Sequence, residues 1–274
     1  MNNLTIDNII INALKEDMPT GDVTVDNLIP DDEISDAKLI AKDNGIISGI
    51  EVFKRVFELI DNTVEINLLV KDGQKVSNKE LLATLHGKTQ TLLKGERTAL
   101  NILQRMSGIA TETNKYVSVC EKTCKILDTR KTMPNLRILD KKAVKDGGGT
   151  NHRYCLSDMV MIKDNHIDAC GSITNAVKLA KEKTHGVKIE VEVETIEQFR
   201  EALNTDCDII MLDNMSDELM RECVLINNHK KKLEGSGNMT LERIPSASKT
   251  GVDYISVGAL THSVKALDIS LKFH

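Results

Sequence analysis

Hydrophobic and polar positions follow two different rhythms along the 274-residue chain. Over residues 1–110 the pattern is mixed. Apolar positions three and four apart predict helices, and short apolar runs between turn residues predict strands. The expected helices cover 6–14, 51–60 and 91–108, and the strand-like stretches cover 37–50 and 64–70. This half therefore predicts a small α+β domain, an N-terminal α/β sandwich built on an antiparallel sheet.

After residue 120 short apolar runs recur, and each ends in polar residues or glycine. The six runs cover 125–132, 159–166, 187–195, 208–216, 231–238 and 253–261. Helical stretches separate them, and strands that alternate with helices are typical of a parallel sheet. Because a complete α/β barrel needs eight units, residues 111–274 predict an incomplete, TIM-like α/β barrel. An open doubly wound sheet is the alternative, but no G-x-G-x-x-G follows any run.

Composition excludes several classes of function. The chain has 36 Lys and Arg against 41 Asp and Glu, a net charge of -5, and only 3% aromatic residues. Nucleic-acid binders need basic surfaces and aromatic platforms, so no nucleic acid is expected as a partner. No apolar run approaches 18 residues, so no membrane span is expected either.

Cysteine usage indicates a compartment. The six Cys include no C-x-x-C pair, and the N-terminal residues lack the basic region of a secretory leader. The surroundings of Cys155 and Cys207 are apolar, so we expect small buried hydrophobes and no zinc site. A reducing cytoplasm fits this pattern.

Charged residues follow the apolar runs directly, at the positions that become strand ends. The series comprises Arg130, Lys131, Lys163, Asp164, Glu190, Glu192, Glu194, Asp213 and Glu234, together with Asn214 and the glycines 235, 237 and 258. The C-terminal ends of barrel strands form the active face, and buried charges need partners or ligands. We therefore expect these residues to line a binding site.

The sequence EVEVE, residues 190–194, places three glutamates on one face of a strand and two valines on the other. The valines should pack outward against helices, which leaves the acids facing the interior. Inward carboxylates need cations, and Asp213 at the end of the next strand would complete a Mg²⁺ site. Which of Glu190, Glu192 and Glu194 acts stays open at this point.

The last two runs, EGSGN and VGALTHS, predict a phosphate site. Backbone N–H groups approach an anion closely at glycines, and Ser236 adds a hydroxyl donor. Gly258 lies at a strand-to-helix turn, where helix N-terminal amides point outward. Barrel enzymes often bind phosphate at this position.

Residues 129–167 carry a dense set of cations around the glycine run 147–149. Lys141 and Lys142 are expected on a solvated helix face. Four others flank strands instead: Arg130, Lys131, Arg153 and Lys163. Arginine grips carboxylate or phosphate through two parallel hydrogen bonds, so this cluster predicts a ligand with several negative charges.

These stretches together resemble the quinolinate phosphoribosyltransferase (carboxylating nicotinate-nucleotide diphosphorylase) family. The similarity extends to EDMPTGDVT, GERTALNILQRMSGIAT, MLDNM and TGVDYISVGALTHSVKALDISLKF, and covers nearly the whole chain. It implies transfer of phosphoribosyl from phosphoribosyl pyrophosphate to quinolinate with Mg²⁺, which yields nicotinate mononucleotide, pyrophosphate and CO₂ in NAD biosynthesis. It also implies a homodimer with shared active sites, which can assemble further.

The resemblance implies roles for particular residues. Quinolinate would be held by Thr129, Arg130, Lys131, His152, Arg153 and Lys163, with Arg97 reaching in from the other subunit. Glu192 and Asp213 would lie near the ribose and metal, and with Lys131 they would be catalytic. The 5′-phosphate pocket would comprise Ser236, Gly237, Asn238, Val257, Gly258, Ala259 and His262. Met133, Asn135 and Asn238 depart from the residues common in the family.

Three alternative functions remain distinct from this one. A related phosphoribosyltransferase would act on nicotinate or another anionic base. A barrel aldolase would use Lys163 as a Schiff-base lysine. A metabolite sensor without activity would not need the acid pair Glu192 and Asp213.

Overall fold

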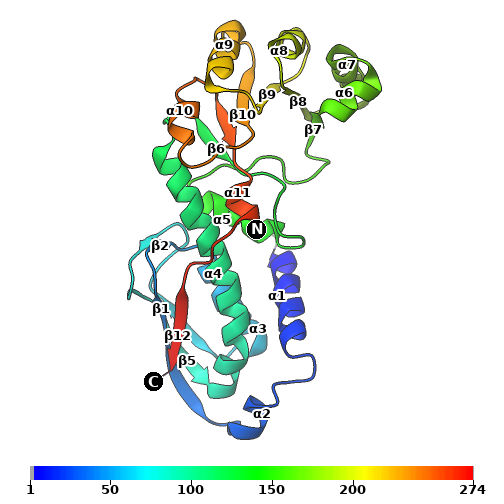
Figure 1. Ribbon diagram of the computed structural model, residues 1–274. Coiled ribbons are helices and arrows are strands. Elements are labelled where there is room, and N and C mark those ends of the chain that lie inside the picture. Colours follow the sequence, from blue (N-terminus) through cyan, green and yellow to red (C-terminus); the bar gives the residue numbers. More distant parts are fainter. Residues whose placement is uncertain (1–2, 274) are drawn as a thin grey trace. The chain divides into compact units, whose positions relative to one another are not determined.

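The computed structural model describes residues 3–273, which form two compact units (Figure 1). Unit 1 contains the residues up to Asn114, Thr132–Gly148 and the residues from Leu260 onward. Unit 2 contains Lys115–Lys131 and Gly149–Ala259. The expected domains, 1–110 and 111–274, are contiguous, whereas two later segments of the chain belong to unit 1.

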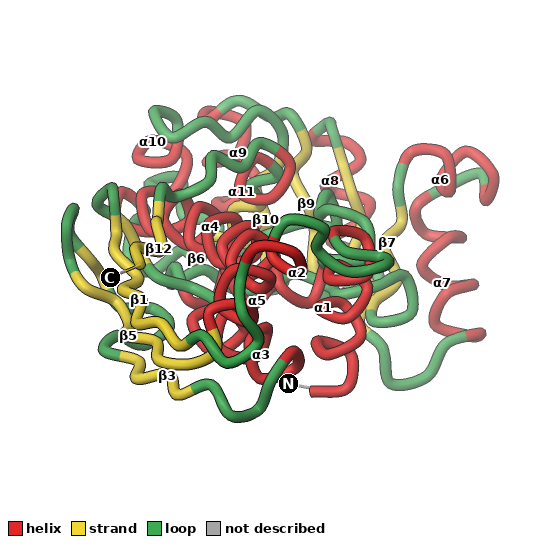
Figure 2. Tube along the Cα trace, turned by 90° about the horizontal axis from the view of Figure 1, so that it is seen from below, coloured by secondary structure: helices red, strands yellow, loops and turns green. Residues whose placement is uncertain are grey.

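Unit 1 is built on antiparallel strands. Its four-stranded sheet has the order β12-β1-β5-β3 (Figure 2), and β2 pairs with β4. The strands are β1 (Ile34–Ala41), β2 (Gly45–Ile46), β3 (Glu65–Leu68), β4 (Lys75–Val76), β5 (Leu81–Lys88) and β12 (Ile269–Phe273). The helices are α1 (Asn3–Asp17), α2 (Val25–Leu28), α3 (Ile50–Ile60), α4 (Thr89–Val119), which continues past Asn114, and α5 (Arg137–Asp146).

The apolar face of α3 shows why the first half folds as predicted. Phe53 and Phe57 are buried one turn apart, and their rings meet edge to face at 5.1 Å. The helix begins after Gly49, whose φ of 93° suits glycine. A Cβ there would lie 2.5 Å from Met106 Sδ, so glycine also permits the close approach of α4.

Two segments from later in the sequence, α5 and β12, belong to unit 1 because they form hydrogen bonds with its first strands and loops. β12 pairs antiparallel with β1, from Ala37 opposite Phe273 to Ala41 opposite Ile269. On α5, Asp146 accepts a hydrogen bond from the Ser48 hydroxyl at 2.6 Å. Lys142 on the same helix bonds to both Asp72 and Asp146.

The expectation that Lys141 and Lys142 form a solvated face was therefore wrong. Lys141 is 2% exposed, and Lys142 is half-buried within its two ion pairs. Burial of a lysine costs free energy unless its ammonium has polar partners. The two lysines are buried or half-buried because α5 packs inside unit 1.

A buried ion pair joins α4 to α5 and yields a stability prediction. Arg105 grips Asp140 through two hydrogen bonds of 2.9 and 2.8 Å, and the Asp140 side chain is fully buried. Removal of one charge leaves the other uncompensated, so Asp140→Asn should lower the free energy of unfolding by about 3 kcal/mol. Urea denaturation measures this.

Asp36→Asn is the matched control, because Asp36 pairs with His86 at an exposed position. Its free energy of unfolding should change by less than about 0.5 kcal/mol. Equal effects of the two substitutions would contradict the importance of the buried pair.

Unit 2 is a six-stranded parallel sheet with the order β6-β11-β10-β9-β8-β7. Each strand lies within one of the six predicted runs: β6 (Lys125–Leu127), β7 (Met159–Ile162), β8 (Lys188–Val193), β9 (Ile209–Asp213), β10 (Lys232–Ser236) and β11 (Tyr254–Ser256). Within residues 3–273, β6 and β7 are the sheet's two edges. The prediction of an α/β fold with fewer than eight barrel units is confirmed.

Helices follow the strands of unit 2 and begin at predictable residues. They are α6 (Asp164–Cys170), α7 (Ile173–Lys183), α8 (Ile196–Leu203), α9 (Asp217–Asn227), α10 (Ile244–Ser248) and α11 (Ala259–His262), whose last residues belong to unit 1. The side chains of Ser172, Thr195 and Ser216 cap α7, α8 and α9 by accepting backbone N–H bonds. Thr195 and Ser216 thus begin helices two to three residues after β8 and β9 end, whereas Ser172 begins α7 after the short helix α6.

The cysteines only partly match expectation. All six are free, and Cys124, Cys207 and Cys223 are buried. Cys155 is half-buried beside Ser157 and Asp158, so the expectation of apolar surroundings was wrong for it. Among the described helices, none has both the length and the apolar character that a bilayer crossing requires.

Candidate active site

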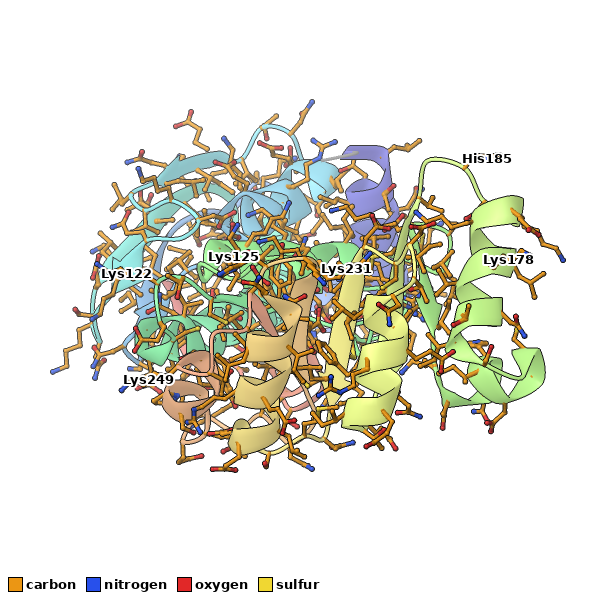
Figure 3. The ribbon with its side chains drawn as sticks, turned by 90° about the horizontal axis from the view of Figure 1, so that it is seen from above. Lys122, Lys125, Lys178, His185, Lys231 and Lys249 are labelled. Carbon is orange, nitrogen blue, oxygen red and sulfur yellow. The ribbon has the colours of Figure 1, made fainter. Side chains whose placement is uncertain are left out.

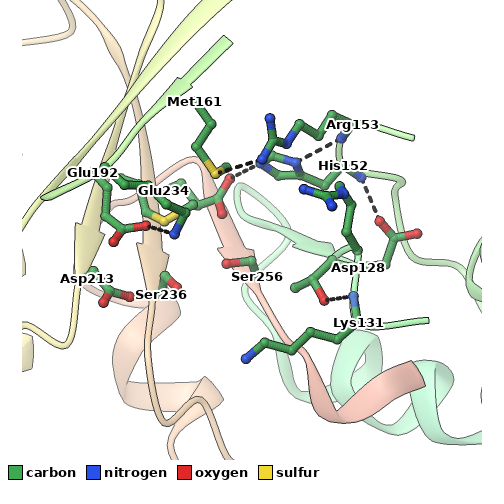
Figure 4. A pocket seen from close by; sticks show the side chains of 14 residues that line it. Asp128, Lys131, His152, Arg153, Met161, Glu192, Asp213, Glu234, Ser236 and Ser256 are labelled. Carbon is green, nitrogen blue, oxygen red and sulfur yellow. Dashed lines mark hydrogen bonds and ion pairs between the residues drawn. The ribbon is translucent and has the colours of Figure 1, made fainter. Parts of the chain in front are cut away.

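A cavity of about 320 Å³ opens at the C-terminal ends of the unit 2 strands (Figure 4). Residues in and after the strands, and two residues of the loop before β7, line it: Asp128, Thr129, Arg130, Lys131, His152, Arg153, Met161, Lys163, Glu192, Met211, Asp213, Glu234, Ser236 and Ser256. This volume is within the range of small-molecule sites.

One wall is cationic. Arg130 and Lys131 follow β6, and the Lys131 backbone N–H donates to Thr129 Oγ1 at 3.1 Å. Arg153 lies in the loop before β7, where Nη1 donates to the Met159 carbonyl at 3.1 Å and Nη2 meets Met161 Sδ at 3.4 Å. Burial, then the neighbouring Arg130, lower the pKa of Arg153, but an arginine with a lowered pKa is still charged near neutrality.

The opposite wall is acidic and hydroxylic, and Figure 4 shows Glu192, Asp213 and Ser236 together there. Glu192 forms an ion pair with Lys163, which follows β7. Asp213 Oδ2 accepts a hydrogen bond from Asn214 Nδ2 at 2.7 Å. Acids and cations therefore face one another across a single cavity, which suits a ligand that carries both anionic and cationic character.

The EVEVE strand separates its three glutamates by depth. Val191 and Val193 are buried, as their outward packing requires. Glu190 is fully buried, Glu192 lines the cavity with 13% of its side chain exposed, and Glu194 is exposed beyond the end of β8. Of the three, only Glu192 lines the cavity.

His152 lies between two buried carboxylates. Its Nε2 is 3.0 Å from Glu190 Oε2 and 3.3 Å from Glu234 Oε2. Burial, then the adjacent Glu234, raise the pKa of Glu190 to about 7. Burial acts to lower the pKa of His152, but the two glutamates outweigh it and raise that pKa. The cluster therefore retains protons to higher pH than its separated groups would.

The raised pKa of Glu190 predicts a pH-dependent stability. The folded value of about 7 exceeds the ordinary value of 4.5, so its favourable contribution is complete below pH 4.5 and is lost as the pH rises through 7. Glu190→Gln removes the titrating carboxyl group and therefore this loss of stability at high pH. The unfolding free energy of the wild type should fall between these limits by up to about 1.4 kcal/mol per pH unit relative to the variant. Urea titrations at several pH values test this, and parallel curves would contradict it.

Comparison with known proteins decides the family. The model of the quinolinate phosphoribosyl transferase C-terminal domain matches residues 109–272, and that of its N-terminal domain matches residues 22–107. The chain belongs to the quinolinate phosphoribosyltransferase family. A probable nicotinate-nucleotide pyrophosphorylase (carboxylating) of Bacillus subtilis is 46% identical over 273 residues, which cover 99% of this chain and 94% of the relative.

Solved structures agree with this family assignment. NadC from Streptococcus pyogenes superposes with a TM-score of 0.96 at 38% identity, and covers 100% of this chain and 99% of its own. The nicotinate-nucleotide pyrophosphorylase from Francisella tularensis also gives 0.96, at 39% identity, and covers 100% and 98%. The similarity therefore includes both units of the chain.

The cavity brings together many of the residues that the resemblance to the quinolinate phosphoribosyltransferase family implied. They are Thr129, Arg130, Lys131, His152, Arg153, Lys163, Glu192, Asp213 and Ser236. Gly237, Asn238, Val257, Gly258 and Ala259 follow β10 and β11 without lining it. Arg97 on α4 and His262 on α11 are exposed residues of unit 1.

Several lining residues were not predicted as site residues. Asp128 directly follows β6 and accepts the His152 backbone N–H at 2.8 Å. Glu234 was expected among the strand-end residues of the binding site, but its buried contact with His152 has no sequence signal of its own. Met161, Met211 and Ser256 lie on strands β7, β9 and β11, and strand alternation alone would have found them.

Two departures from the family pattern fit the backbone. Asn135 and Asn238 have φ values of 65° and 49°, in the left-handed region that asparagine tolerates better than most residues. Gly237 has a φ of 87°, and a Cβ there would lie 2.2 Å from Asn214 Oδ1. The loop after β10 therefore accepts asparagine at 238 but requires glycine at 237.

Other basic residues of unit 2 lie outside the cavity. Figure 3 shows Lys122, Lys125 and Lys249 at the surface, where all three are exposed. Lys231 instead donates to the carbonyls of Thr205 and Cys207. The strand-end cations are thus distinct from the lysines that serve solubility or loop structure.

Proposed function

We propose that this chain transfers the phosphoribosyl group of phosphoribosyl pyrophosphate to quinolinate and releases pyrophosphate and CO₂. The product is nicotinate mononucleotide, a precursor of NAD. One observation carries the proposal: a cationic wall with Arg130, Lys131 and Arg153 faces Glu192 and Asp213 across one cavity. The names of the family and of its relatives give the same substrate class.

The cationic wall fits a pyridine dicarboxylate. Arg130 and Arg153 on this wall, together with Lys163 from its place beside Glu192, neutralise the two carboxylates and orient the ring nitrogen toward the sugar C1. The thioethers of Met161 and Met211 cover the apolar ring, because methionine adapts to flat aromatic surfaces. Arg97 is assigned to the same substrate from the partner subunit.

The acidic wall fits the phosphoribosyl group. As pyrophosphate leaves, C1 gains positive charge, and the Glu192 carboxylate stabilises that charge. Ser236 lines the cavity and donates to the 5′-phosphate. The remaining phosphate-pocket residues are Gly237, Asn238, Val257, Gly258, Ala259 and His262, which are assigned by similarity to the family.

Mg²⁺ is the proposed cofactor, and the donor set fits it. Glu192 and Asp213 present carboxylate oxygens to the same cavity, and Mg²⁺ prefers oxygen ligands with retained water. When bound there with the substrate, Mg²⁺ would neutralise charge on the pyrophosphate.

Decarboxylation follows from electrostatics in the same cavity. Once the ring nitrogen carries the sugar it is positively charged, and this charge makes the adjacent carboxylate a good leaving group. The ammonium of Lys131 then stabilises the carbanion that CO₂ leaves behind, and a proton from solvent adds to that carbon to complete nicotinate mononucleotide. The proposed catalysis therefore consists of positioning and electrostatics.

A product assay tests the proposal. Purified protein with quinolinate, phosphoribosyl pyrophosphate and Mg²⁺ should release CO₂ and nicotinate mononucleotide in equal amounts. Nicotinate in place of quinolinate tests the related phosphoribosyltransferase, and borohydride trapping at Lys163 tests the aldolase. Folded protein that forms no nicotinate mononucleotide from quinolinate would refute the proposal.

We further propose a cytoplasmic homodimer with shared active sites. Free cysteines fit a reducing compartment. If Arg97 serves the partner's site, mixed Arg97→Ala and Lys163→Ala subunits form some dimers with one intact site. Each variant alone should be inactive, and the mixture should recover up to about a quarter of wild-type activity by random pairing. No recovery in verified mixed dimers would refute sharing.

A further inference from the structure

Two buried glutamates, Glu234 in the cavity wall and Glu190 behind it, have no role in the proposed chemistry. Glu190 on β8 and Glu234 on β10 lie on either side of β9, with Ile209 and Met211 as their respective partners on that strand. Both side chains are fully buried and meet at His152 Nε2. Buried carboxylates cost free energy unless they are paired, so their presence under an anion site calls for a physical reason.

The ring of His152 is engaged at both nitrogens. Its Nδ1 accepts a hydrogen bond from the Arg153 backbone N–H at 2.8 Å. An imidazole nitrogen that accepts a hydrogen bond has no proton, so in this geometry the ring proton is on Nε2 and faces the two glutamates, and the further proton that the cluster retains is carried by the carboxylates. The ring therefore has no N–H left to donate to a quinolinate carboxylate.

A metal ion is the alternative occupant of this cluster. The ligand atoms of His152, Glu190 and Glu234 lie within 4.8 Å of one another. A metal at Nε2 would bind the lone pair of that nitrogen, while the lone pair of Nδ1 already accepts the hydrogen bond from Arg153. A neutral imidazole carries a proton on one of its two ring nitrogens, so it cannot offer both lone pairs. The hydrogen bond from Arg153 thus favours an Nε2–H group that lies at ion-pair distance from both carboxylates.

We propose that His152 is a positioning residue: Glu190 and Glu234 hold its Nε2, its Nδ1 holds the backbone of Arg153, and quinolinate is bound by Arg153 rather than by His152. The inference rests on the proposed function. It explains the buried glutamates as the anchor of a loop that carries a substrate-binding arginine. Residues 151–153 belong to no helix or strand, so the anchor replaces the support that a regular element would give.

The geometry of the loop supports this anchor. The His152 backbone N–H donates to Asp128 Oδ1 at 2.8 Å, which ties the loop to the end of β6. The guanidinium of Arg153 reaches β7 through the Met159 carbonyl. The loop is thereby fixed to β6, β7, β8 and β10 at successive atoms, and the guanidinium is placed before substrate arrives. Such preorganisation reduces the entropy lost on binding.

A double-mutant cycle tests the proposal by calorimetric titration of quinolinate. His152→Asn should weaken quinolinate binding about 10-fold in the wild type and less than about 2-fold in an Arg153→Lys background, because the lost placement acts through Arg153. Equal losses in both backgrounds would mean that His152 contacts the substrate directly and would overturn the proposal. The exposed His185 (Figure 3) supplies the matched control, His185→Asn, which should change nothing.

Glu234→Gln gives a second cycle if His152→Asn does not fold. This variant keeps an oxygen beside Nε2 but loses the charge. It should raise KM for quinolinate several-fold, leave KM for phosphoribosyl pyrophosphate unchanged, and lose its effect in the Arg153→Lys background. A proportional change in both KM values would overturn the proposal. Wild-type protein that binds no quinolinate would instead refute the proposed function, so the two failures are distinguishable.

Discussion

Replacement of Arg153 by alanine is expected to weaken quinolinate binding about 100-fold and to leave phosphoribosyl pyrophosphate binding within about twofold. Loss of one partner from a desolvated charge pair costs roughly 2–5 kcal/mol, and tenfold in affinity is about 1.4 kcal/mol. Arg153 lies on the cationic wall, away from Glu192 and Asp213 on the other (Figure 4). Titration calorimetry with each substrate separately measures both effects.

Two further variants sharpen this test. Arg153→Lys keeps a charge but loses the planar fork, so it should recover only part of the affinity. Arg221→Ala is the matched control, because Arg221 is an exposed arginine of the same unit with only a long contact to Glu218. Equal losses of affinity for both substrates would show that Arg153 supports the whole cavity rather than the quinolinate site.

The strands and the walls of the cavity could be predicted from the sequence because both depend on local pattern. Each apolar run of unit 2 contains one strand, and the residue after it is placed by the strand's end. In a parallel sheet these ends share one edge, so Arg130, Lys163 and Asp213 meet without further information. Serine and threonine caps then fix where the helices begin.

What the sequence did not reveal depends on contacts between distant segments. β12 joins β1 over more than 200 residues, and no periodicity announces that pairing. Lys141 reads as a solvated lysine until α5 is known to pack within unit 1. Glu190 and Glu234 likewise read as strand-end acids, and their burial at His152 depends on the order of strands in the sheet.

The net charge of the chain concealed its ligand for a related reason. A total of -5 averages acids over the whole surface, whereas binding depends on the few charges that share one cavity. The scarcity of aromatic residues also has a local meaning there. Methionines, not aromatic rings, are the large apolar residues of the cavity wall, so recognition of a pyridine ring would depend on its carboxylates.

Glu192→Gln should lower kcat about 100- to 1,000-fold and leave KM for quinolinate nearly unchanged. In the proposed mechanism its carboxylate stabilises the positive charge that develops on the sugar, and loss of a preorganised electrostatic group costs about 3–4 kcal/mol in the transition state. In the proposed arrangement the quinolinate carboxylates lie mainly on Arg130 and Arg153 of the opposite wall, so ground-state binding of quinolinate should be little affected. Steady-state kinetics with CO₂ release as the readout separates kcat from KM.

The strand itself supplies the control for this prediction. Glu194 belongs to the same alternating series but is exposed beyond the end of β8, so Glu194→Gln should retain wild-type kcat. Glu192→Gln also removes the ion pair with Lys163, so a second variant that keeps the negative charge is needed. Glu192→Asp keeps the charge and withdraws it from the sugar, so it should recover only part of the rate. Full activity of Glu192→Gln, or equal losses at 192 and 194, would contradict a role for this carboxylate in the chemical step.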